Sequence, residues 1–100
     1  MSDLTSKQRA HLRGLAHSLK PLAHVGKEGV TPAAVRALQQ TFDTHELVKV
    51  RVLEAAPQDV RETAHALAEG VDGASVVQTV GRTATLYRAD PDTPQIRLPA

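Results

Sequence analysis

The sequence predicts one α/β (α+β) domain with elements in the order α-β-α-β-α-β-β. Apolar residues recur at helical spacing in three segments, they alternate with charged residues over 47–53, and only two residues separate the last two strand-like runs. One hundred residues suffice for one hydrophobic core and are too few for two. Right-handed crossovers between parallel strands place the second and third helices mainly on one face of a small mixed sheet. The pattern does not decide whether the first helix covers the other face.

The first helix begins after Thr5, which is followed three residues later by Gln8 in the pattern of a capping box. Its apolar stripe consists of Leu12, Leu15, Ala16 and Leu19. Basic side chains lie outside this stripe, namely Lys7, His11, Arg13 and His17, with Arg9 near its edge. Pro21 ends the helix, and a short strand is expected to follow up to Val25.

The second helix is expected over residues 32–44, with Thr31 as N-cap and Pro32 at the first helical position. Its buried side is formed by Ala34, Val35, Leu38 and Phe42. A strand over residues 47–53 follows, in which three valines alternate with Lys49 and Arg51. Because side chains alternate across a strand, one face is expected to be buried and the other basic.

The third helix is predicted to begin at Pro57 and to end near Gly70, with largely acidic exposed positions. Two further strands, over residues 75–80 and 83–88, leave only Gly81 and Arg82 for a hairpin turn with Arg82 at its tip. The core of the single domain is therefore expected at about residues 4–88. Residues 89–100 are expected to form a loosely held tail, with a small edge contact through Ile96 and Leu98.

The loop Gly26-Lys27-Glu28-Gly29 joins the first strand to the second helix. Two glycines permit a tight turn with exposed amides, and the positive end of a helix dipole lies directly behind them. This combination predicts a site for a phosphate-sized anion. The spacing is short and also occurs in ordinary turns, so a turn without a ligand is the alternative interpretation.

Composition excludes several classes of function. The chain has no cysteine and no tryptophan, and only one Phe and one Tyr, so disulfides, thiolate metal sites and an aromatic base-stacking platform are not expected. Histidine and serine residues match no metal-binding or nucleophile motif, so we expect no enzyme, no metal and no cofactor. No apolar run reaches membrane-spanning length and no leader is evident, which favours a cytoplasmic protein.

Charge is distributed unevenly along the chain. Residues 1–51 carry eight Lys/Arg against four Asp/Glu, a net charge of +4, whereas residues 52–100 carry four against seven, a net charge of −3. This asymmetry is typical of a protein that binds a polyanion with one face. An ordinary solvated surface is the alternative.

Three stretches carry a resemblance to a known family: LTSKQRAHLRGLAHSLKPLAHVGKEGVT, HELVKVRV and VVQTVGRTATLYR. With the intervening helices they span residues 4–88 and resemble the CRM domain (chloroplast RNA splicing and ribosome maturation) in its stand-alone bacterial form, the YhbY family. The resemblance implies a fold similar to the C-terminal domain of bacterial translation initiation factor three. It also implies a non-enzymatic RNA-binding protein, with a loop like that of KH domains, that associates with ribosomal RNA in large-subunit precursors and assists ribosome assembly.

Transferred to this sequence, the resemblance and the neighbouring basic positions predict a set of RNA-contacting residues. These are Lys20, Gly26, Lys27, Glu28, Gly29, Arg36, Lys49, Arg51, Arg82 and Arg88. Within the loop, the Glu28 carboxylate opposes an incoming phosphate. The alternative is a protein–protein docking module for a ribosomal protein or an assembly GTPase, with basic residues that only steer the encounter. A monomer is expected in either case.

Overall fold

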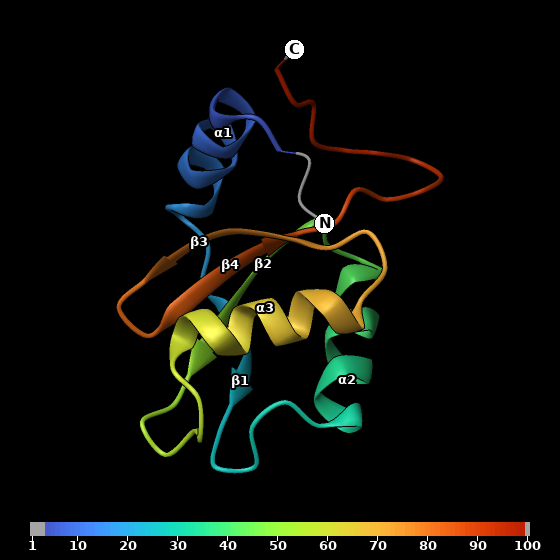
Figure 1. Cartoon of the computed structure of the whole chain (residues 1–100). Coiled ribbons are helices and arrows are strands. Elements are labelled where there is room, and N and C mark those ends of the chain that lie inside the picture. Colours follow the sequence, from blue (N-terminus) through green and yellow to red (C-terminus); the bar gives the residue numbers. More distant parts are fainter. Residues whose placement is uncertain (1–3, 100) are drawn as a thin grey trace.

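The computed structural model describes residues 4–99, which form three helices and a four-stranded sheet (Figure 1). In chain order the elements are α1 (Ser6–Ala16), β1 (Pro21–Val25), α2 (Pro32–Phe42), β2 (Leu47–Val52), α3 (Val60–Gly70), β3 (Ser75–Val80) and β4 (Thr83–Tyr87). The strand order is β1-β2-β4-β3, with β1 parallel to β2 and the other neighbours antiparallel. The predicted class, element order and mixed sheet are therefore confirmed. Within the described residues, no helix is long and apolar enough to span a membrane.

Helices cover both faces of the sheet, but unequally (Figure 1). On one face, α2 and α3 enclose the main core, which includes Phe42, Val48, Val50, Leu67 and Leu86. On the other face, α1 covers part of the sheet through a smaller cluster of Leu12, Ala16, Leu47, Val77 and Tyr87. The prediction that α2 and α3 share a face is confirmed. The structure also shows that α1 lies on the opposite face, which the sequence pattern did not decide.

The predicted helix starts of α1 and α2 are confirmed by their caps. The Thr5 hydroxyl accepts the Gln8 amide at 3.1 Å, and the Gln8 side-chain oxygen accepts the Thr5 amide at the same distance. The Thr31 hydroxyl accepts the Ala34 amide at 3.1 Å, with Pro32 in the first turn. These bonds satisfy amides that have no partner inside the helix.

The predicted start of α3 at Pro57 is wrong. The helix begins at Val60 because the Asp59 carboxylate accepts the Glu62 amide at 2.8 Å and acts as the N-cap. Three other elements end one or two residues before the expected positions, namely α2 at Phe42, β2 at Val52 and β4 at Tyr87.

The expected apolar stripe of α1 was too wide. The helix ends at Ala16, and Leu15 and Leu19 are 41% and 39% exposed. Leu12 and Ala16 are completely buried because they lie one turn apart on the side that contacts the sheet. α1 is therefore held by a narrow contact.

Both edge strands carry an irregularity in their pairing. In β3, Val76 pairs with Leu86 and Gln78 pairs with Thr85, so Val77 is an extra residue. In β1, the pairing shifts in the same way between Pro21 and Ala23. The Arg9 guanidinium of α1 donates hydrogen bonds to the carbonyl oxygens of Val76 and Val77, at the irregularity of β3.

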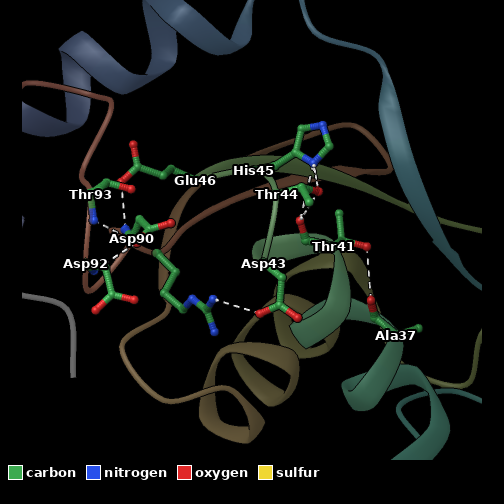
Figure 2. A network of polar contacts seen from close by, with 10 residues as sticks. Ala37, Thr41, Asp43, Thr44, His45, Glu46, Asp90, Asp92 and Thr93 are labelled. Carbon is green, nitrogen blue, oxygen red and sulfur yellow. Dashed lines mark hydrogen bonds and ion pairs between the residues drawn. The ribbon is translucent and has the colours of Figure 1, made fainter.

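The segment after β4 is attached to the domain through Glu46. This carboxylate is 8% exposed and accepts the backbone amide of Asp90 at 2.6 Å (Figure 2). It also accepts the amides of Gln95 at 2.8 Å and Ile96 at 2.7 Å. Hydrogen bonds from the amides of Thr93 and Asp92 lower the pKa of the Asp90 carboxyl. Ile96 and Leu98 pack against the α1 cluster. How loosely residues 89–100 are held stays a prediction.

Candidate nucleic-acid interface

The loop between β1 and α2 forms a closed turn. The Gly29 amide donates to the Gly26 carbonyl at 2.9 Å, and Gly29 has a φ of +69°. A Cβ at Gly29 would lie 2.9 Å from Cγ of Pro57, so both conformation and space require glycine there. Lys27 and Glu28 occupy the exposed corner of this turn.

Fewer backbone amides face outward than the loop spacing suggests. Pro32 has no N–H, and Thr31 accepts the amide of Ala34 with its hydroxyl and that of Val35 with its carbonyl at 3.0 Å. The Gly29 amide is also occupied, within the turn. An anion at this loop would therefore depend on the Lys27 ammonium and the dipole of α2 more than on an array of amides.

The strand β2 divides its side chains between the two faces of the sheet. Val48 and Val50 are buried against α2 and α3, whereas Lys49 is half-buried and Arg51 is exposed on the α1 side. The prediction that both charges project away from the main core is thus confirmed. Arg51 pairs with His24 near the end of β1 that leads into the loop, so the His24 imidazole lies beside Arg51 on the same face.

A groove of about 260 Å³ lies between α1 and the sheet, and we call it the α1-side groove. Its lining residues are Arg13, His17, Pro21, Lys49, Gln78, Val80, Thr83 and Thr85. Sequence reasoning did not assign Arg13 and His17 to a site because the docking face of α1 was unknown. The signal was present in the spacing of Arg9, Arg13 and His17, which places the three on one side of the helix.

The structure brings some of the predicted residues to one end of the sheet. The turn Gly26–Gly29 follows β1, and Arg82 lies at the hairpin between β3 and β4, where its carbonyl accepts the Val52 amide at 2.7 Å. Arg82 and Lys27 are both exposed. Lys20 precedes β1 and so lies at the other end of that strand, and Arg36 is exposed on α2.

Arg88 is not brought together with the others. It follows β4 at the end opposite the hairpin, about 20 Å from Arg82 by the rise of a strand. Its guanidinium lies 3.6 Å from the Asp43 carboxylate and 5.4 Å from the centre of the Phe42 ring. With its side chain only 19% exposed, Arg88 fastens the end of β4 to α2.

Over residues 4–99, no three His, Asp or Glu side chains come close enough together to hold a metal ion. The imidazole Nδ1 of His45 lies 2.9 Å from the Thr44 hydroxyl and 3.3 Å from the Thr41 carbonyl (Figure 2). His45 thus contributes to the turn that joins α2 to β2.

These features define a small α+β domain with Lys27 on an exposed loop and with Arg13, Lys49 and Arg51 on the α1 side of its sheet. The chain belongs to the CRS1 / YhbY (CRM) domain family, whose model matches residues 4–88.

Similar proteins cover nearly the whole chain. It is 38% identical over 96 residues to the Probable RNA-binding protein YqeI of Bacillus subtilis (strain 168), and this alignment covers 96% of this chain and 99% of the relative. It is 33% identical over 99 residues to an RNA-binding protein of Haemophilus influenzae, covering 99% of this chain and 98% of the relative. The solution structure of the hypothetical protein SAV1595 from Staphylococcus aureus matches with a TM-score of 0.80 and 34% identity, covering 96% and 99% of the two chains.

Proposed function

We propose that this protein binds RNA, that its target is ribosomal RNA in precursors of the large subunit, and that it assists ribosome assembly without enzymatic activity. The observation that carries the proposal is membership of the CRM family over residues 4–88, with relatives that are named as RNA-binding proteins. The ribosomal target rests on the family resemblance of the three sequence stretches described above.

The distribution of side chains supports contact with the RNA backbone. Lys27 and Arg82 lie at one end of the sheet, and Lys49 and Arg51 project from the face that α1 covers only in part. The single Phe and the single Tyr, Phe42 and Tyr87, are both buried and therefore unavailable for stacking on bases. Such a surface reads the shape and charge of a backbone rather than its base sequence.

Crosslinking in cells, followed by mapping of the bound nucleotides, tests this function directly. We expect crosslinks concentrated in large-subunit ribosomal RNA, and co-sedimentation with precursor particles that is lost after nuclease treatment. Association that survives nuclease, with no RNA crosslinks, would instead identify the protein as a docking module for another protein.

Replacing Lys27 with alanine should weaken RNA binding by about 1 kcal/mol, because it removes a partly solvated charge-assisted contact. The exposed position of Lys27 means that folding should be unaffected. Affinity measured by fluorescence anisotropy, with circular dichroism as the folding control, checks this result. An affinity equal to that of the wild type would remove the loop from the interface.

Replacing Glu28 with glutamine should tighten RNA binding at low salt by a few tenths of a kcal/mol. Glu28 is exposed beside Lys27, and its charge repels a phosphate that approaches the same turn. Affinities at low and high salt provide the measurement, since the gain should disappear as salt screens the repulsion. Weaker binding by the variant would mean that Glu28 makes a specific contact with RNA.

A further inference from the structure

The α1-side groove has an uncompensated positive charge. Arg13 and Lys49 line it beside the His17 imidazole, and none of its lining residues is a carboxylate. Three other hollows of the described surface each include carboxylates, beside α3 (Glu69), beside the hairpin (Glu54 and Asp59) and beside the tail (Asp43, Glu46 and Asp90). A concave site with cations and no carboxylate attracts anions more strongly than a convex patch of the same charge.

The position of the cationic wall is fixed by the fold. Arg9 is anchored to the carbonyls of Val76 and Val77, which sets the rotation of α1 over β3. Arg13 and His17 follow one and two turns later on the same side of the helix, and both line the groove. Lys49 reaches the same space from β2, opposite the helix. An anion in the groove would therefore meet positive charge from two elements.

The extra residue in β3 also shapes this site. Val77 is the extra residue in the pairing of β3 with β4, so two consecutive side chains face α1. Val77 packs in the apolar cluster of α1, and Gln78 lines the groove. Thr83 and Thr85 of β4 add hydroxyl groups to the lining. These neutral groups can donate and accept hydrogen bonds, as recognition of a 2′-hydroxyl requires.

We propose that the α1-side groove holds a ribose-phosphate segment of bound RNA. Arg13 and Lys49 contact the phosphate, and Gln78 and Thr83 contact the ribose. No Phe, Tyr or Trp side chain lines the groove, and its polar lining suits the sugar-phosphate backbone better than a base. This inference rests on the proposed RNA binding, and it adds α1 to an interface otherwise formed by the loop and the sheet.

A near-isosteric change tests the groove without removing packing volume. Gln78→Glu places a carboxylate among the groove's cations, whereas Gln39→Glu makes the same change on α2, across the sheet. With a labelled mixed-sequence single-stranded RNA, we expect binding by Gln78→Glu to weaken at least fivefold at low salt, and less at high salt. Binding by Gln39→Glu should stay within twofold of the wild type.

An exposed cation provides a second variant that leaves packing intact. Arg13→Ala should weaken binding of the same RNA about fivefold and make the log–log salt slope shallower by about 0.7. Arg61→Ala removes an equivalent charge from the exposed surface of α3 and should change neither quantity.

Comparison of RNA with DNA of the same sequence tests the ribose contact. Thr83→Val removes a partly exposed hydroxyl from the groove with little change in volume, and should lower the ratio of RNA affinity to DNA affinity. Thr79 pairs with Ala84 and faces the opposite side of the sheet. Thr79→Val should therefore leave the ratio of RNA affinity to DNA affinity unchanged.

Two results would overturn the proposal in different ways. If Lys27→Ala weakens binding while Gln78→Glu and Arg13→Ala bind RNA like the wild type, the groove lies outside the interface and the proposed function stands. If the wild type binds no RNA but binds an acidic peptide that Gln78→Glu no longer binds, the groove takes a protein segment and the RNA assignment fails with it.

Discussion

Replacing Glu46 with alanine should lower the free energy of unfolding by about 3 kcal/mol, because three backbone amides lose a charged acceptor at once. These amides belong to Asp90, Gln95 and Ile96, and Glu46 itself is buried. Release of these amides would also remove the apolar contacts of Ile96 and Leu98 with the α1 cluster. Urea denaturation, compared with the wild type at the same pH, measures the effect.

Glu54→Ala is the matched control for this prediction, because Glu54 is an exposed carboxylate in the loop after β2. It should change stability by no more than about 0.5 kcal/mol. The free energy of unfolding of Glu46→Gln should lie between those of Glu46→Ala and Glu54→Ala. Its side-chain amide keeps one oxygen acceptor but turns an NH₂ group toward backbone donors. Equal stability of Glu46→Ala and Glu54→Ala would show that Glu46 does not anchor the tail.

The single tyrosine reports on the same carboxylate. Burial, and after it the negative charge of Glu46, raises the pKa of Tyr87 above its ordinary value of 10.0. Loss of the charge in Glu46→Ala should therefore lower the Tyr87 pKa part of the way toward 10.0. The ultraviolet absorbance of tyrosinate measures this change independently of unfolding.

The double change Lys49→Ala and Arg51→Ala should have the largest effect on RNA binding, weakening it by about 2 kcal/mol, or roughly thirtyfold in Kd. Both side chains project from the α1 side of β2 while the adjacent valines stay in the core. If about five phosphates are neutralised, the log–log salt slope on single-stranded RNA is near −3.5, and two lost contacts make it shallower by about 1.4. Different RNA sequences should be affected by similar factors.

A salt series for the wild type and the double variant decides this prediction. Arg61→Ala combined with Arg97→Ala removes the same net charge from exposed positions on α3 and the tail, and should leave the slope unchanged. If the Lys49/Arg51 variant keeps the wild-type slope, RNA binds elsewhere and this face becomes a candidate for protein docking.

The sequence predicted the elements whose causes are local. The capping box at Thr5 and Gln8, the Thr31 cap and the two-residue hairpin at Gly81 each depend on a few adjacent residues, and all are present. Alternation along β2 likewise predicted which side chains would be buried. The start of α3 was missed because a proline and an aspartate two residues apart both give a plausible helix start, and Asp59 provides the actual cap.

The features that sequence reasoning missed depend on contacts between distant segments. Glu46 binds amides 44 to 50 residues further along the chain, so nothing near it in the sequence marks it as an anchor. Arg88 is held by Asp43 and Phe42 across a similar separation, although the family resemblance and its positive charge predicted an RNA contact. The α1-side groove exists only once α1 has docked, and neither the charge pattern nor the strand pattern specified that docking.

The irregular pairing of the two edge strands has a consequence for self-association. An open sheet edge is a template on which a second copy can add a strand, and such pairing leads to aggregation. Here β1 begins with a proline, which has no N–H to offer, and its pairing is shifted beside that residue. At the opposite edge, β3 is bent by its extra residue, and Arg9 occupies two of the carbonyls there. Both borders of the sheet are therefore poor templates, which favours a protein that stays dispersed at high concentration.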